Sequence, residues 1–294
     1  MIGIGAFGGR ADVHAPGLAA LVGRFVKLGM REWLRRIRLL AFILLQLGAL
    51  PAEPIPVRYR EGTNHGFLAV RTLEGKILAA GDLTQTVRKN VVVSRLVFRF
   101  RDGSVDDETA TFSQERAFRL ISDHHVQKGP SFPNPTDVSI HASTGQVTVR
   151  YTDKGKEKVE TKRLDLPLDL ANGIILDVLK NIRPDTSETK VSYVVATPDP
   201  RLVKLSIVAQ GEDRFSVVGA AYKATLFVLK VELGGLTGVI APLIGKQPPD
   251  TKVWVVASGT PAFVKAEQSL YPGGPVWRIE MTSPAWPNAP KSHR

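Results

Sequence analysis

Short segments in which apolar and polar residues alternate follow one another along most of this chain. In residues 91–101, Leu96, Phe98 and Phe100 lie on one face of an extended strand, and arginines lie on the other. Asp102-Gly103 then supplies a tight turn, a pattern typical of a β-hairpin. Strands joined by such short turns pair antiparallel, so this feature restricts the chain to antiparallel sheet architectures.

The same alternation predicts further strands on both sides of this one. Because so many strands force a sheet to curl or split, we predict a mainly β fold with one large curved antiparallel sheet, an open or partial barrel. The remaining predicted strands cover residues 66–72, 76–88, 109–113, 118–127, 137–142, 146–151, 157–163, 190–197, 201–210, 215–221, 224–233, 253–257, 263–270 and 276–281.

Two segments interrupt the strands. Leu170, Ile174, Val178 and Ile182 recur every four residues after a candidate N-cap at Asp169, which predicts one central amphipathic helix packed against the sheet. Residues 236–244 are apolar and bounded by glycines and prolines, which predicts a short apolar helical segment. This segment either plugs the open end of the sheet, forms a mobile lid, or touches a membrane.

Residues 30–52 have the three parts of a secretory signal peptide. Arginines at positions 31, 35, 36 and 38 precede an apolar run over 39–50, and Ala49 and Ala52 are candidate cleavage positions. The apolar run is shorter than the roughly 20 residues of a permanent membrane span. We therefore expect a leader over 1–52, a single β-rich exported domain over 53–294 with a frayed C-terminal tail, and a periplasmic or extracellular location.

The leader leaves alternatives open. Residues 1–29 do not fit the signal plan, so we hypothesise that Met30 is the true start of the protein. Arg35-Arg36 is similar to a twin-arginine signal, but Arg38 stands where that signal has an apolar residue, which favours the general secretory route. A retained signal anchor is the competing interpretation.

The positive charge of the chain is concentrated in this leader. Residues 1–50 contain seven Lys or Arg and two Asp or Glu, which is +5 of the formal net charge of +11. The remaining domain is only moderately basic, so we expect no nucleic-acid partner. The chain has no cysteine, which excludes disulfides, cysteine-ligated zinc and a thiol nucleophile.

Three segments carry a resemblance to a known family: Asp169-Leu-Ala-Asn-Gly-Ile174 and the glycine- and proline-rich residues 234–250 and 273–280. With them, the chain resembles a family of exported bacterial β-rich proteins of unknown function, and the resemblance implies no assigned activity. The strand layout is also loosely similar to the open β-barrels of periplasmic lipoprotein carriers, which wrap a sheet around helices and hold acyl chains.

No recognised catalytic or cofactor motif is present, so we predict no catalytic residue, metal ligand or cofactor. His124 and His125 are neighbours on a predicted strand and should face opposite sides, which opposes a shared metal. Asp106-Asp107-Glu108 follows a turn and is expected to be a solvated hairpin. Lys265, Glu267, Arg278 and Glu280 are placed for ion pairs between neighbouring strands.

The leading hypothesis is a non-enzymatic exported protein that binds a lipid or other apolar ligand in the concavity of the sheet. The alternatives are an envelope structural or assembly module that binds a protein partner at a sheet edge, and a metal-dependent hydrolase that uses His124 or His125. No transmembrane span is expected after processing. The predicted ligand-binding residues are Ile174, Val178, Leu236, Ile240, Leu243, Trp254 and Trp277.

Overall fold

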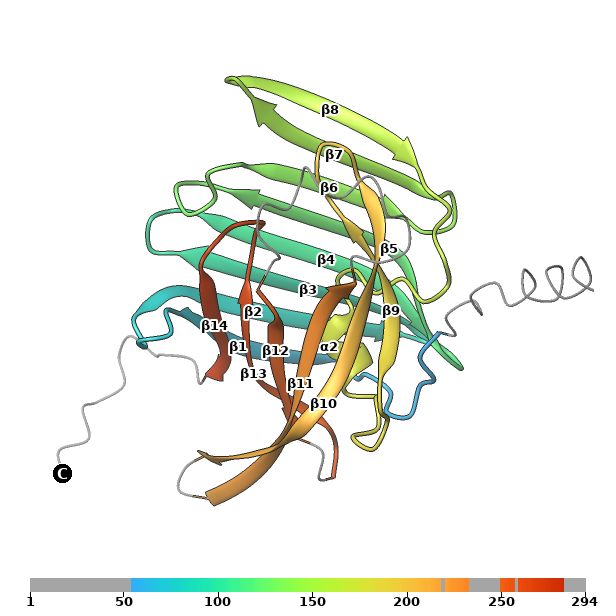
Figure 1. The fold of residues 1–294 in the computed structure, drawn as a ribbon, viewed down its shortest axis with the longest axis vertical. Helices are drawn as coiled ribbons and strands as arrows, with labels where there is room; N and C mark the ends of the chain where they lie inside the picture. The colour runs from blue at the N-terminus through green and yellow to red at the C-terminus, as the bar shows by residue number, and fades with distance from the viewer. Residues whose placement is uncertain (1–53, 218–219, 233–248, 257–258, 283–294) are drawn as a thin grey trace, which may run out of the picture. The chain divides into compact units, whose positions relative to one another are not determined.

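The computed structural model describes residues 54–217, 220–232, 249–256 and 259–282 (Figure 1), all within a compact unit that spans Ala52–Arg294. These residues form one sheet in which every neighbouring pair of strands is antiparallel. Its strands are β1 (Asn64–Arg71), β2 (Ile77–Arg88), β3 (Val91–Phe100), β4 (Val105–Gln114), β5 (Phe118–Lys128), β6 (Thr136–His141), β7 (Gln146–Asp153), β8 (Lys156–Arg163), β9 (Thr189–Val195), β10 (Arg201–Val217), β11 (Ala220–Glu232), β12 (Thr251–Val256), β13 (Ala262–Ser269) and β14 (Val276–Thr282).

The sheet consists of two meanders that are joined through their outermost strands in the sequence. Strands β1 to β8 follow one another in order, as do β9 to β14, and β1 pairs with β14 between Phe67–Thr282 and Arg71–Arg278. Strands β8 and β9 are the two edges and do not pair with each other, so the sheet is not closed into a barrel. The predicted mainly β, antiparallel architecture is confirmed.

The connection between β8 and β9 must run from one edge of the sheet to the other. On this path, Leu170 forms a parallel bridge with Ser192 on β9. A few residues later, a Cβ on Gly173 would lie 2.7 Å from the Cβ of Ala110 on β4 and 2.7 Å from Oδ1 of Asp123 on β5. The connection therefore links the β9 edge to the face of β4 and β5, which we call the inner face because it carries the buried core.

The predicted central helix is wrong. Among the described residues, helix in this region is reduced to α2 (Ile175–Leu179). Gly173 has a φ of +66°, which breaks a right-handed helix, and the Asn172 side chain bonds both the N–H and the C=O of Val194 at 2.8 and 3.0 Å. The four-residue spacing arose because the crossing connection is buried on nearly all sides.

Asp169 is not a helix cap in the structure. It accepts hydrogen bonds from Ser192 Oγ at 2.8 Å and from Lys204 Nζ at 2.9 Å, which fixes the start of the crossing connection to β9 and β10. Helix α2 has Ile174 at its N-cap position and no side-chain cap. Polar side chains thus attach this connection to the sheet through hydrogen bonds. In a longer helix, the backbone N–H and C=O groups would have bonded to one another instead.

Strand boundaries differ from the prediction at two places that bear on function. β10 is one strand, whereas the sequence predicted two, over residues 201–210 and 215–221; Gly211 has a φ of +108° and the register shifts between Ala209 and Glu212, as in a β-bulge. β4 begins at Val105, so the predicted solvated hairpin over residues 106–108 is part of a strand. No helix of the described residues is long and apolar enough to cross a membrane.

Candidate functional site

A tryptophan on β12 lies on the face of the sheet opposite the core. Val253 and Val255 belong to the buried core, so Trp254 between them points to the other face, which we call the outer face. The register places Trp254 between Leu226 on β11 and Lys265 on β13. Trp254 is nevertheless only 6% exposed, so other side chains must cover it.

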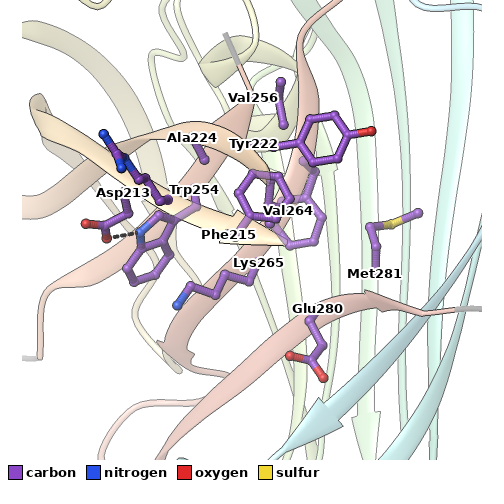
Figure 2. Close-up of a pocket in the computed structure, with 12 residues that line it drawn as sticks. Asp213, Phe215, Tyr222, Ala224, Trp254, Val256, Val264, Lys265, Glu280 and Met281 are labelled. Carbon is purple, nitrogen blue, oxygen red and sulfur yellow. Dashed lines mark hydrogen bonds between the residues drawn. The ribbon is translucent and has the colours of Figure 1, made fainter. Parts of the chain in front are cut away.

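Two polar groups hold the Trp254 ring (Figure 2). The indole N–H donates a hydrogen bond to Oδ2 of Asp213 on β10 at 2.7 Å. The Lys265 ammonium lies over the ring, 4.1 Å from its centroid, a cation–π contact. The ring is therefore fixed at its edge by a carboxylate and on one face by a cation.

A pocket of about 700 Å³ opens beside this tryptophan. Its apolar wall includes Phe215 of β10 and Tyr222 of β11, whose rings stack with centroids 5.6 Å apart. In the view of Figure 2, the side chains of Trp254 and Met281 of β14 lie to the left and to the right of these rings. Tyr222 and Met281 are 44% and 45% exposed, so the pocket presents an apolar surface to solvent. The complete lining is Asp213, Arg214, Phe215, Tyr222, Ala224, Trp254, Val256, Phe263, Val264, Lys265, Glu280 and Met281.

The long hairpin of β10 and β11 builds this pocket. Because the bulge at Gly211 lets β10 continue, Phe215 pairs with Tyr222 and Asp213 pairs with Ala224 beyond it. The sequence predicted instead a separate strand over residues 215–221. The sequence therefore did not predict that Phe215 faces Tyr222. An isolated glycine within a strand pattern, here Gly211, is typical of a β-bulge and would have indicated one continuous strand.

The ion pairs predicted between neighbouring strands form only in part. Arg278 pairs with Glu267 across β13 and β14 at 3.1 Å, as predicted. Glu280 lies opposite Lys265 in the register, but it pairs with Arg71 of β1 at 2.5 Å. Lys265 consequently has no carboxylate partner among the described residues.

Three of the residues predicted to bind a ligand are buried in the core on the inner face of the described sheet. Ile174, Val178 and Trp277 are 1%, 2% and 8% exposed and belong to the packed core. Trp277 contacts Phe100, with ring centroids 5.4 Å apart. A hollow near Leu179 has a volume of about 40 Å³, which is room for a water molecule but not for an acyl chain.

The remaining predicted ligand-binding residues separate into two groups. Trp254 lines the pocket, but on the outer face, opposite to the concavity expected for it. Leu236, Ile240 and Leu243, together with the whole apolar segment 236–244, lie outside the described residues.

A cluster of charged side chains from β4 and β5 lies on the inner face, although the sequence predicted a solvated hairpin over residues 106–108. Glu108 on β4 lies opposite His125 on β5, and Asp106 accepts a hydrogen bond at 2.6 Å from Nε2 of His125. Asp123 lies two residues before His125 and is 4% exposed, and its Oδ1 has no hydrogen-bond partner within the described part of the chain. The expectation that this acidic run is solvated was wrong for Asp106, which is 5% exposed.

The surroundings of this inner cluster change its proton affinities. Burial raises the pKa of Asp123 well above its usual range, and the charge of Glu108 raises it further. Burial also raises the pKa of Glu108. Burial opposes the charged form of His125, but the hydrogen bond that His125 donates to Asp106 and the neighbouring carboxylates outweigh it and raise the pKa of His125 to about 9.

The two histidines face opposite sides of β5, as predicted. His124 is exposed and lies 2.9 Å from Asp137, whereas His125 lies on the inner face with Asp106. Within the described ranges, no group of three or more His, Cys, Asp or Glu side chains is arranged to hold a metal ion.

The free edge at β8 is exposed on both faces and strongly charged. Its lysines alternate with glutamates, and Lys158 and Lys162 form ion pairs with Asp153 and Asp199 at 2.6 and 2.7 Å. Charged residues on an edge strand are typical of edges that avoid pairing with another chain. This edge therefore does not favour the alternative of a protein partner that adds a strand.

Comparisons with known proteins identify likeness in fold without a function. No family model matches this chain, and no curated protein is similar to it in sequence. It is similar to the beta-barrel-like protein of domain of unknown function DUF1849 from Brucella abortus, at 11% identity and a TM-score of 0.44, over 76% of this chain and 98% of that one. It is also similar to the hypothetical lipoprotein YmcC from Escherichia coli (K12), at 8% identity and a TM-score of 0.34, over 75% and 85% of the two chains. These likenesses agree with the expected resemblance to bacterial β-rich proteins of unknown function, and at such TM-scores they imply no shared activity.

Proposed function

We propose that this protein is an exported, non-enzymatic binding protein that holds one apolar ligand in the pocket beside Trp254. The observation that carries the proposal is the pocket of about 700 Å³ with its aromatic wall. Small-molecule sites commonly have volumes of about 300–1,000 Å³ and a predominantly apolar lining with a few placed polar groups. The pocket has this composition, with Phe215, Tyr222 and Phe263 beside the fixed ring of Trp254.

The exposure of the apolar lining supports binding over simple core packing. Tyr222 and Met281 leave nearly half of their surface in water, whereas the core aromatics Phe100 and Trp277 are 7% and 8% exposed. Covering apolar surface contributes about 25 cal/mol for each Å² removed from water. A ligand in the pocket would gain this stabilisation without any rearrangement of the core.

Export is part of the proposal because it rests on the leader. The three-part pattern over residues 30–52 would direct residues 53–294 across the inner membrane, where a protein that shields apolar molecules from water has a role. Cell fractionation with N-terminal sequencing of the recovered protein tests this part. Recovery of the intact leader from a cytosolic fraction would overturn it.

The binding experiment uses the purified full-length exported protein. Native mass spectrometry before and after solvent extraction shows whether an apolar molecule co-purifies. The extracted protein is then titrated with N-phenyl-1-naphthylamine, a neutral apolar probe that fluoresces on leaving water. We expect one saturable probe site per chain.

Variants connect the probe to this pocket. Tyr222→Asp places a charge on the exposed aromatic wall and should weaken probe binding at least about tenfold, or about 1.4 kcal/mol. Val159→Asp is the matched control, since Val159 on β8 is 46% exposed and lies outside the pocket lining. Equal probe affinity in both variants, or no saturable binding in the unchanged protein, would contradict the proposal.

A further inference from the structure

We propose that the ligand of this pocket is a single-chain amphiphile with a carboxylate head, and that Lys265 binds this head. This inference rests on the proposed function, because it names the chemistry of the ligand held at the same site. It starts from the charged side chains that line the pocket, which are Asp213, Arg214, Lys265 and Glu280.

The two carboxylates of the pocket are already engaged. Asp213 accepts the indole N–H of Trp254 at 2.7 Å, and Glu280 pairs with Arg71. Arg71 therefore compensates the charge of Glu280, and the indole N–H holds one oxygen of Asp213 against the Trp254 ring. Glu280 lies opposite Lys265 in the register, but its carboxylate is engaged by Arg71.

Lys265 remains as a cation without a carboxylate partner within the described part of the chain. Its ammonium rests against the face of Trp254, at 4.1 Å from the ring centroid. An ammonium group has three N–H donors, and the aromatic face satisfies only one side of it. The remaining donors can bind an anion that enters the pocket, a contact that a charge-assisted hydrogen bond would strengthen.

The position of Lys265 distinguishes between classes of ligand. A neutral apolar molecule that filled the pocket would cover this ammonium and remove its water without offering an acceptor, which is unfavourable. A cationic amphiphile would add like-charge repulsion. A carboxylate head compensates the lysine charge, while its chain covers Phe215, Tyr222 and Met281.

The second charged group of the lining differs in geometry. Arg214 lies opposite Lys223 in the hairpin, between Asp213 and Phe215, and neighbours on a strand point to opposite faces. Its guanidinium therefore belongs to the face opposite the Phe215 ring, although part of the residue borders the pocket. Of the two cations in the described lining, Lys265 is therefore the one whose side chain lies on the outer face with the Phe215 ring.

The test compares three probes that share one twelve-carbon chain: dodecanoate, methyl dodecanoate and dodecylamine. Each is titrated below its micelle concentration at pH 7.5 into the solvent-extracted full-length protein, with isothermal calorimetry as the readout. We expect dodecanoate to bind at least about tenfold more tightly than the ester, and dodecylamine to bind most weakly.

Lysine variants then separate the head from the chain. Lys265→Met should weaken dodecanoate about tenfold and should keep or improve the affinity for the ester, whereas Lys265→Arg should retain most of the affinity for dodecanoate. Lys223→Met is the matched control, because Lys223 lies on the same hairpin, pairs with Glu212 at 2.8 Å and is not part of the lining. Urea unfolding of each variant verifies that it is folded.

The outcomes are distinguishable from failure of the proposed function. Equal affinity for dodecanoate and its ester, or equal weakening of both by Lys265→Met, would overturn the carboxylate head and leave apolar binding in place. Absence of binding by all three amphiphiles, while N-phenyl-1-naphthylamine still binds at Tyr222, would also overturn this inference alone. Absence of binding by the neutral probe as well would overturn the proposed function itself.

Discussion

The backbone of Gly173 lies directly against the carboxyl group of Asp123, so close that a Cβ at Gly173 would be 2.7 Å from Oδ1 of Asp123. This contact connects the crossing connection to the inner face of the sheet. It also requires a backbone conformation with a φ of +66°, which glycine adopts without strain. Only a residue without a Cβ fits both the contact and the positive φ, so Gly173 fixes the point at which the connection crosses the sheet.

We expect Gly173→Ala to lower the free energy of unfolding by about 2–4 kcal/mol, from the strained φ together with overpacking against Asp123 and Ala110. Gly155→Ala is the control, since Gly155 has a φ of +75° but nothing within 4 Å of its added Cβ. It should cost only the conformational part, about 1 kcal/mol. Urea unfolding measures both, and equal losses would show that the contact with Asp123 is unimportant.

His125 should make stability depend on pH in the neutral to alkaline range. Its pKa is raised from 6.5 to about 9 in the folded protein by Asp106, Glu108 and Asp123, so the folded state binds the proton more tightly than the unfolded state. This stabilisation is complete below about pH 6.5 and is lost as the pH rises to about 9. At about 1.4 kcal/mol per pKa unit, the loss is of the order of 2–3 kcal/mol.

The measurement is urea unfolding at several pH values between 6.5 and 9. His125→Gln should flatten the decline, whereas His124→Gln, which changes an exposed residue on the other face, should retain it. The raised pKa of Asp123 acts in the same direction, because its deprotonation on rising pH is more costly in the folded state. A pH dependence that His125→Gln leaves intact would assign the decline to groups other than this histidine.

Lys180 should be among the most costly charges to remove. It lies 2.7 Å from Glu61 and 2.9 Å from Asp177, and these two side chains are only 9% and 4% exposed. Lys180→Met would leave two buried carboxylates without their cation, and we expect a loss of about 3–5 kcal/mol. Lys190→Met, which removes an exposed partner of Glu232, should cost less than about 1 kcal/mol. Similar losses for both would contradict the role of burial.

Asn172 should control the stability of the β9 edge. Its amide satisfies both the N–H and the C=O of Val194, and it is 4% exposed. Asn172→Ala would leave two buried backbone groups unpaired, at about 1–3 kcal/mol each when water does not replace the amide. Hydrogen exchange at the Val194 amide should become faster, while Thr148→Ala, at an exposed hydroxyl pair with Thr161, should leave it unchanged. Unaltered protection of Val194 would contradict the assignment.

The strands of this protein could be predicted because their alternation is local. The alternation of Phe98 and Phe100 with arginines predicts the inner face of β3. Asp102-Gly103 predicts the turn that follows, in which Gly103 has a φ of +86°. The helix prediction failed because a four-residue apolar period also arises in a connection that is buried on several sides. Ile174 and Val178 are one turn of α2 apart, whereas Leu170 and Ile182 are buried outside that short helix.

The burial of two acidic residues on β4 follows from the two-residue period of that strand. Asp106 and Glu108 share the parity of Ala110 and Phe112, which are core residues, so the two-residue period alone places both acids on the inner face. The pocket was harder to predict, because it depends on which strands are neighbours. Nothing local in the sequence indicates that Lys265 stacks on Trp254, or that Glu280 pairs with Arg71 from the other meander.

The pairing of β1 with β14 has a consequence for the order of events during synthesis. Strand β1 leaves the ribosome early, but one of its edges has no partner until Val276–Thr282 has been made. The closure therefore brings together segments about two hundred residues apart, a type of contact that slows folding. The two meanders can therefore join through β1 and β14 only after β14 has been synthesised.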